Sequence, residues 1–219
     1  MTKNTLFYIH DPMCSWCYAF KPVLQQLRLQ LSKQYADALK FTSLLGGLAG
    51  DTQEPMSAEL RQQLHDTWLH IEKKLPNTQF NYDFWQHWQV SKPRRSTYPA
   101  CRAVIAAHQF DTDDTHHYED RMIDAIQTAY YQQALNPSEN TVLEALAKQI
   151  GLAHKAFQSV FSAPQTHRTL EQHLALCQQM KVQSYPSLVL KLEHSYWPIS
   201  VDYYQADTII ETINSLIEF

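Results

Sequence analysis

The chain has no long apolar run, no excess of basic residues and few glycines. No stretch of its 219 residues approaches the roughly 18 apolar residues that a membrane-spanning helix needs, so we expect no membrane partner. Eighteen Lys and Arg against 22 Asp and Glu give a formal net charge of -4, which provides no basic field to attract nucleic acid. Four glycines, 44% hydrophobic and 18% charged residues exclude a disordered chain or a solenoid and favour well-packed helices.

Cysteine is also scarce, since four in the whole chain are too few for a disulfide scaffold. The N-terminus contains no apolar segment of a signal peptide before Asp11 and Pro12 interrupt it. We therefore expect a cytoplasmic protein, in which closely spaced cysteines serve catalysis or metal binding. The densest basic segment holds Lys92, Arg94 and Arg95. We interpret it as a solvated loop, as most short charge runs are.

The segment Cys14-Ser15-Trp16-Cys17 lies between a predicted strand and a predicted helix. Residues 5–10 form a short apolar run, and residues 16–35 carry apolar side chains at spacings of three and four. Unpaired backbone N–H groups and the positive end of the helix dipole should favour the charged form of Cys14 over its thiol. We expect Cys14 to be an accessible nucleophile and Cys17, one turn later, to be more sheltered.

The elements around this pair predict an α/β chain with a helical insertion. A second strand over 39–45 completes a βαβ unit with a parallel crossover. From Ser57, a plausible N-cap, to about Lys181 the apolar period is almost wholly helical.

The C-terminal segment predicts a hairpin and a last helix. Residues 187–192 and Tyr196–Tyr203 form the hairpin, with Pro198 marking its second strand as an edge, and the helix begins near Asp207. The fold class is a thioredoxin-like fold, βαβ then ββα, with a large inserted helical domain. We assign residues 1–50 and 182–219 to the thioredoxin-like domain and residues 51–181 to the insertion.

The spacing of Cys14 and Cys17 suits disulfide exchange. Two intervening residues let Cys17 reach back to a mixed disulfide on Cys14 and expel the substrate thiol. Half of a zinc site is one alternative, but no second ligand pair with suitable spacing follows, and His10 could add a third ligand at best. A merely structural pair is the other alternative. We predict a redox site and no metal.

Tyr185-Pro186 directly precedes the predicted strand over 187–192. A cis peptide bond there could present backbone groups to an extended substrate chain, although most bonds preceding proline are trans. Cys177 lies on an apolar helical stripe, which is typical of a buried small side chain. Cys101 borders an apolar face near a helix start. We favour packing for it, with an approach to the active site as the alternative.

With these residues in this order, the chain resembles the DsbA-like branch of the thioredoxin superfamily, and more narrowly its FrnE-type or predicted protein-disulfide isomerase group. The segment from Asp11 to Cys17 resembles the active-site opening of that group. Other segments resemble its helical domain and the approach to its cis-proline strand: Ala129-Tyr-Tyr through Asn136-Pro-Ser, Leu143-Glu-Ala-Leu-Ala147, Ile150-Gly-Leu152, Phe157 and Val182-Gln-Ser-Tyr-Pro186-Ser.

The resemblance implies thiol–disulfide exchange on protein substrates with no bound prosthetic group. It makes Cys14 the attacking thiol, Cys17 the resolving thiol and Pro186 the substrate-loop proline, and we add Ser15, Trp16 and Tyr185 as candidate substrate contacts. Ser15-Trp16 is neither the Pro-His of the strong periplasmic oxidant nor the Gly-Pro of thioredoxin, so no redox potential is carried over. Tyr185 stands where a smaller residue is often found.

We therefore expect a cytoplasmic enzyme that reduces or isomerises disulfides in proteins or peptides, drawing electrons from a reducing dithiol or glutathione system. One alternative is a glutathione-dependent transferase or isomerase acting on a small molecule, with glutathione as co-substrate. Another is a redox-inactive binding module on the same fold. The proton acceptor for Cys17 is not assigned, and His10 and Asp11 are the nearest titratable residues in sequence.

Overall fold

The computed structural model describes residues 4–35, 38–86, 88–112 and 117–217. The chain divides into two compact units, one formed by Met1–Gly46 with His173–Phe219 and the other by Gly47–Gln172. The breaks therefore fall after residue 46 and after residue 172, whereas the sequence-based boundaries are 50 and 181. No helix within the described ranges has both the length and the apolar character needed to span a bilayer.

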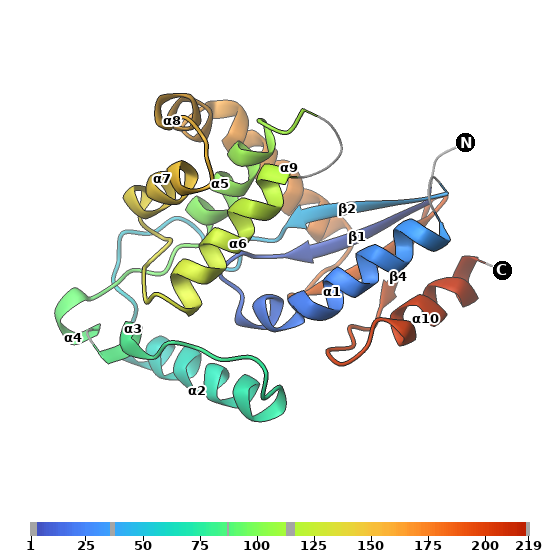
Figure 1. Cartoon of the computed structure of the whole chain (residues 1–219), viewed down its shortest axis with the longest axis horizontal. Helices are drawn as coiled ribbons and strands as arrows, with labels where there is room; N and C mark the ends of the chain where they lie inside the picture. Colours follow the sequence, from blue (N-terminus) through green and yellow to red (C-terminus); the bar gives the residue numbers. More distant parts are fainter. Residues whose placement is uncertain (1–3, 36–37, 87, 113–116, 218–219) are drawn as a thin grey trace. The chain divides into compact units, whose positions relative to one another are not determined.

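The first unit is built on a four-stranded sheet in the order β2-β1-β3-β4 (Figure 1). β1 (Asn4–His10) pairs in parallel with β2 (Leu39–Leu45) through the crossover helix α1 (Ser15–Gln34). β3 (Ser187–Leu192) runs antiparallel to both β1 and β4 (Ser195–Ile199), and α10 (Asp207–Ile217) follows. This order confirms the predicted thioredoxin-like fold.

The side chains of β1 point alternately to the two faces of the sheet, so the core of this unit has two parts, one on each face. Leu6 and Tyr8 lie in one buried cluster with side chains of α1 and α10, which cover that face. Phe7 and Ile9 lie in a second cluster with Cys177, which belongs to the last turns of α9 (Pro164–Gln179). Successive strand residues point to opposite faces, so the sheet is covered by helix on both sides.

The edge strand β4 ends earlier than the sequence predicts. The extended run was expected to continue to Tyr203, but the ladder stops at Ile199. The carboxylate of Asp202 accepts the backbone N–H groups of Tyr204, at 2.7 Å, and Gln205, at 3.1 Å. This side-chain turn gives the backbone hydrogen bonds other than those of strand pairing, so the strand ends before it. The prediction that the strand lies at the edge of the sheet is confirmed.

The second unit consists of helices packed around buried aromatic rings. Ser57 caps the first of them as predicted, its hydroxyl accepting the N–H of Leu60 at 3.1 Å. Trp68 is almost fully buried and lies within 5 Å, between ring centroids, of both Phe80 and Trp85. The helices of this unit are α2 (Ala58–Lys74), α3 (Asp83–Gln86), α4 (Trp88–Ser91), α5 (Tyr98–His108), α6 (His117–Tyr131), α7 (Asn140–Gln149), α8 (His154–Phe161) and the first turns of α9.

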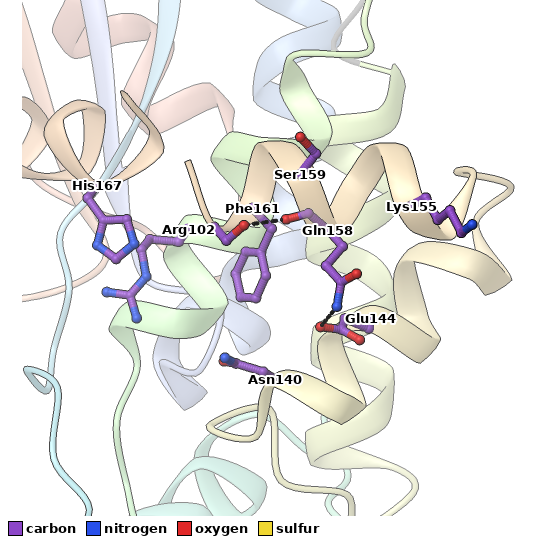
Figure 2. Close-up of a pocket in the computed structure, with 9 residues that line it drawn as sticks. Arg102, Asn140, Glu144, Lys155, Gln158, Ser159, Phe161 and His167 are labelled. Carbon is purple, nitrogen blue, oxygen red and sulfur yellow. Dashed lines mark hydrogen bonds between the residues drawn. The ribbon is translucent and has the colours of Figure 1, made fainter. Parts of the chain in front are cut away.

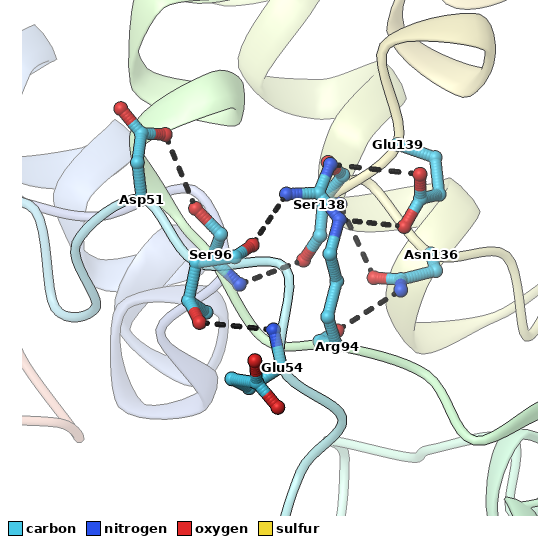
Figure 3. Close-up of polar contacts among 8 residues, drawn as sticks. Asp51, Glu54, Arg94, Ser96, Asn136, Ser138 and Glu139 are labelled. Atoms are coloured by element: carbon cyan, nitrogen blue, oxygen red, sulfur yellow. Dashed lines mark hydrogen bonds and ion pairs between the residues drawn. The ribbon is translucent and has the colours of Figure 1, made fainter.

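The interpretation of residues 92–95 as a solvated loop was wrong for Arg94. Its side chain is 12% exposed, and its guanidinium joins its own segment to two others of the unit (Figure 3). It donates to the Glu139 carboxylate at 2.9 Å, to the carbonyl of Thr52 at 2.8 Å and to the carbonyl of Ser138. Charge density alone did not reveal this role, because the partners lie more than 40 residues away in sequence.

Replacing Arg94 with alanine is expected to lower the free energy of unfolding of this unit by about 2–4 kcal/mol, because two backbone carbonyls and a carboxylate lose a charged donor. Arg168→Ala is the matched control, since that exposed side chain donates to Gln165 within its own helix turn, and the substitution should cost less than about 0.5 kcal/mol. Urea denaturation measures both. Equal midpoints for the two variants would show that the Arg94 contacts do not stabilise the fold.

Candidate active site

Cys14 is the N-cap of α1, and the turn before it is held by Asp11. After β1 ends at His10, the Asp11 carboxylate accepts the N–H of Met13 at 2.7 Å and its carbonyl accepts the N–H of Cys14 at 3.0 Å. The sulfur of Cys14 then accepts the N–H of Cys17 at 3.3 Å. A backbone amide and the positive end of the helix dipole are both directed at this sulfur, an arrangement that stabilises negative charge on it.

Cys17 lies in the first turn of α1, with its side chain facing the interior. It is 1% exposed, and both cysteines are free thiols. Burial raises the pKa of the Cys17 thiol well above its ordinary value, and the hydrogen bond and charge of neighbouring Cys14 raise it further. Cys17 is therefore the more sheltered thiol, as the helix geometry predicts, and its raised pKa keeps it protonated.

The prediction that Cys14 is openly accessible was wrong. The residue is only 5% exposed, because the segment before β3 brings the carbonyl of Tyr185 to 3.5 Å from its sulfur. In the thiol form, the S–H of Cys14 donates to that carbonyl. The expectation considered the helix end alone, and the covering group comes from a residue 171 positions later in the chain.

Tyr185 and Pro186 form the second part of the site. Their peptide bond is cis, and Pro186 is buried immediately before β3. The Tyr185 hydroxyl donates to the carbonyl of Gly46 at 2.8 Å. The structure thus brings together Cys14, Cys17, Tyr185 and Pro186, four of the residues singled out from the sequence.

The two residues between the cysteines differ in their surroundings. Ser15 is buried, while Trp16 is half-buried and meets the ring of Tyr203 edge-on, with 5.1 Å between centroids. Trp16 therefore presents part of its ring to solvent beside Cys14, whereas Ser15 packs inward.

Among the described residues, no three His, Cys, Asp or Glu side chains are grouped so that they could hold a metal ion.

Comparison with known families decides the identification. The family model described as thioredoxin matches residues 7–196, which include both cysteines and Pro186. The chain belongs to the thioredoxin family. No curated protein matches it in sequence.

Solved structures place this thioredoxin-family chain among DsbA-like folds. A protein from Nitrosomonas europaea, provisionally described as a disulfide isomerase, has a TM-score of 0.79 at 22% identity, with 99% of this chain and 98% of that one covered. The cytosolic disulfide reductase DsbM from Pseudomonas aeruginosa, solved with GSH, has a TM-score of 0.70 at 23% identity, with 98% and 100% covered. DsbA from Xylella fastidiosa has a TM-score of 0.62 at 16% identity, with 99% and 87% covered. These likenesses show that the fold of this chain is the one that DsbA-like proteins share.

Two tyrosines of this thioredoxin-family chain escaped the sequence analysis. Tyr8, on β1, is buried, and burial followed by the charges of Cys17 and Cys14 raises the pKa of its hydroxyl well above the ordinary value. The same three causes raise the pKa of Tyr203. Both hydroxyls therefore stay protonated beside the sulfurs. Strand alternation could have identified Tyr8 as facing α1, but nothing local connects Tyr203 with the cysteines.

His10 and Asp11, the titratable residues nearest to the cysteine pair in sequence, are both buried. His10 is 1% exposed, stacks on Tyr8 with 4.7 Å between ring centroids, and exchanges a hydrogen bond with the Ser43 hydroxyl at 2.8 Å. Asp11 is fully buried, and its backbone hydrogen bond lowers the pKa of Cys17 while its charge raises it. Cys101 and Cys177 are buried in their helices, and burial raises the pKa of Cys177 to about 11. Packing is thus confirmed for Cys177.

A polar cavity of about 540 Å³ lies within the helical unit (Figure 2). Arg102 and His167 both line it, as labelled in Figure 2. The Arg102 guanidinium is already paired with Asp51, at 2.7 Å, and lowers the pKa of that carboxyl. The cavity therefore presents no uncompensated buried charge from this arginine. Its lining residues are Arg102, Asn140, Glu144, Lys155, Gln158, Ser159, Phe161, Ser162 and His167.

Proposed function

We propose that the chain is a thiol–disulfide oxidoreductase that reduces or isomerises disulfides of protein or peptide substrates. The observation that carries the proposal is the asymmetry of its two cysteines. Cys14 caps a helix and receives a backbone N–H at its sulfur, while Cys17 is buried one turn away with a raised pKa. One thiol is thus prepared to attack, and the other keeps its proton until it is needed.

The reaction consists of two exchanges. The thiolate of Cys14 attacks one sulfur of the substrate disulfide, forming a mixed disulfide and releasing the first substrate thiolate. Cys17 then loses its proton and attacks the Cys14 sulfur, forming the Cys14–Cys17 disulfide and releasing the second substrate thiolate. Two electrons pass from the enzyme to the substrate. In isomerisation a different thiolate of the substrate attacks the substrate sulfur of the mixed disulfide, which forms a new substrate disulfide and releases Cys14 as a thiolate.

The proton on Cys17 responds to the progress of this reaction. The neighbouring sulfur of Cys14 helps to raise the pKa of Cys17. Once Cys14 is bound in a mixed disulfide its negative charge is gone, so this cause disappears and Cys17 loses its proton more readily. Formation of the mixed disulfide therefore prepares the resolving thiol. Asp11 is buried near Cys17, where its backbone hydrogen bond lowers the pKa of that thiol and its charge raises it.

The backbone near Pro186 supplies a place for the substrate chain. The Tyr185 carbonyl that meets the Cys14 thiol loses its donor when the sulfur enters a mixed disulfide. A backbone N–H of an extended substrate can then take that position, as in the addition of a strand to a sheet edge. Trp16, half-exposed beside Cys14, offers an aromatic surface to the substrate side chains.

We further propose that the oxidised pair is reduced by a dithiol or glutathione system in the cytoplasm. The similar fold of DsbM, a cytosolic disulfide reductase solved with GSH, supports this assignment. A glutathione poise of roughly -220 to -320 mV keeps most dithiols reduced, so reduction or isomerisation is the expected direction of turnover. The alternative, a glutathione-dependent enzyme acting on a small molecule, requires activity that survives loss of Cys17.

The test is a single-turnover reaction of the reduced enzyme with one equivalent of a protein disulfide, followed over pH. Burial is the largest cause of the raised pKa of Cys17, and it persists when Cys14 is in the mixed disulfide. The thiolate fraction of Cys17 therefore grows as the pH rises through and above the ordinary thiol value of about 8.5. Release of the second substrate thiol should therefore accelerate across this range. A reaction that releases no thiol at any pH would exclude the proposed function.

A further inference from the structure

Gly46 follows β2 directly, and its backbone is hydrogen-bonded to the side chain of Tyr185. Its N–H donates to the carbonyl of His10 at 2.7 Å, which extends the pairing of β1 and β2 by one residue. Its carbonyl accepts the Tyr185 hydroxyl at 2.8 Å. Gly46 is buried, so this hydrogen bond ties the tip of the Tyr185 side chain to the end of the sheet.

Only glycine leaves room for this contact. A Cβ atom on residue 46 would overlap the Cε1 and Cζ atoms of the Tyr185 ring. Gly46 is not among the glycines with positive φ, so its backbone is open to other residues and the requirement is for space. The overlapping atoms belong to the end of a side chain. A larger residue would therefore displace the ring and leave the strand in place.

The other end of Tyr185 faces the attacking sulfur. Its carbonyl lies 3.5 Å from the Cys14 sulfur, and its ring packs against the cluster that contains Ile9 and Leu44. The hydroxyl bond to Gly46, the ring packing and the carbonyl contact belong to one residue. The position of the ring on Gly46 therefore determines where the carbonyl lies relative to Cys14.

We propose that Gly46 and Tyr185 form a positioning pair: the space above Gly46 holds the Tyr185 ring, which fixes the Tyr185 carbonyl against Cys14 and sets both the shielding of this thiol and the binding of an extended peptide disulfide. The part that concerns peptide binding rests on the proposed function. The part that concerns shielding does not, because it can be measured on the enzyme alone. Tyr185 acts here without donating its proton to sulfur, since its hydroxyl donates to Gly46.

The test is a double-mutant cycle of Gly46→Ala, Tyr185→Ala and the two combined. Two readouts are used for each variant: the rate at which iodoacetamide alkylates Cys14, identified by peptide mass, and the separate kcat and KM for a disulfide-bonded peptide. Gly46→Ala alone should speed alkylation and raise KM about tenfold. In the Tyr185→Ala background the same substitution should change neither by more than about twofold, because no ring is left to displace.

Tyr185→Phe isolates the hydroxyl. Loss of one neutral hydrogen bond should raise KM about threefold to tenfold, with kcat changed less and alkylation of Cys14 accelerated. Tyr204→Phe is the matched control, because that ring is 67% exposed in the same unit, and it should behave as the wild type. Thermal melting of every variant reports whether the fold is retained.

Two results would overturn the pairing of Gly46 with Tyr185. One is an equal effect of Gly46→Ala in both backgrounds, which would mean that Gly46 serves the fold without acting through Tyr185. The other is a wild-type alkylation rate in both Gly46→Ala and Tyr185→Phe. Alkylation needs no substrate. If the protein were inactive on every disulfide, the proposed function would be refuted, but the alkylation rates would still test the pairing of Gly46 with Tyr185.

Discussion

Replacement of Cys14 by serine is expected to abolish disulfide reduction, with kcat/KM falling on the order of 10³-fold or more, because a hydroxyl is not ionised near neutrality and cannot form a disulfide. The substitution is conservative for the fold. Serine is a preferred N-cap, so its oxygen can accept the N–H of Cys17 as the sulfur does now. Loss of activity with an unchanged melting temperature would therefore report the chemistry of the sulfur. The assay is release of substrate thiols from a protein disulfide.

Cys177→Ala is the matched control for this experiment. Cys177 is another buried thiol of the same unit, and its pKa of about 11 leaves it protonated. The variant should keep kcat/KM within about twofold, although it removes a buried sulfur and so lowers stability slightly. If the wild type and Cys14→Ser reduce the protein disulfide at the same rate, Cys14 is not the nucleophile. If neither releases substrate thiols faster than the reaction without enzyme, the redox-inactive binding module becomes the better account.

Features that depend on neighbouring residues could be predicted from the sequence. The strand over 5–10, the helix after the cysteine pair and the cap at Ser57 all follow from local periodicity and capping chemistry, and the structure contains each of them. The spacing of Cys14 and Cys17 is equally local, because one helical turn fixes the distance between the two side chains.

Features that depend on distant residues could not be predicted in this way. The carbonyl that covers Cys14 comes from Tyr185, and the glycine that accommodates Tyr185 is Gly46. No periodicity connects these positions, so the burial of Cys14 was missed. Arg94 was misread for the same reason, since its acceptors come from segments around residues 52 and 138.

The resemblance to DsbA-like proteins supplied what local patterns could not. It made Pro186, which local sequence had marked only as preceding a strand, the substrate-loop proline, and the structure places the carbonyl of the adjacent Tyr185 beside Cys14. It did not supply Tyr8 or Tyr203, whose hydroxyls lie in the electrostatic environment of both sulfurs. These tyrosines belong to the packing between β1, α1 and the segment after β4. Alternation along β1 could have placed Tyr8 against α1, whereas the position of Tyr203 became visible only in three dimensions.

The second large effect is expected from Cys17→Ser. This variant keeps the attacking thiol and removes the group that resolves the mixed disulfide, so the covalent complex with the substrate should accumulate. Turnover should fall by about tenfold or more, because release must wait for an external thiol. Undiminished activity with glutathione would instead favour the glutathione-dependent alternative, in which Cys17 has no part.

The most direct measurement is the intact mass and peptide map of the Cys17→Ser protein after reaction with a protein disulfide. We expect one substrate chain linked to the enzyme through a disulfide at Cys14, and no such adduct when Cys14 is also replaced by serine. An adduct mapped to Cys101 or Cys177, or no adduct at all with a substrate that the wild type reduces, would contradict the assignment of Cys14 as the attacking thiol.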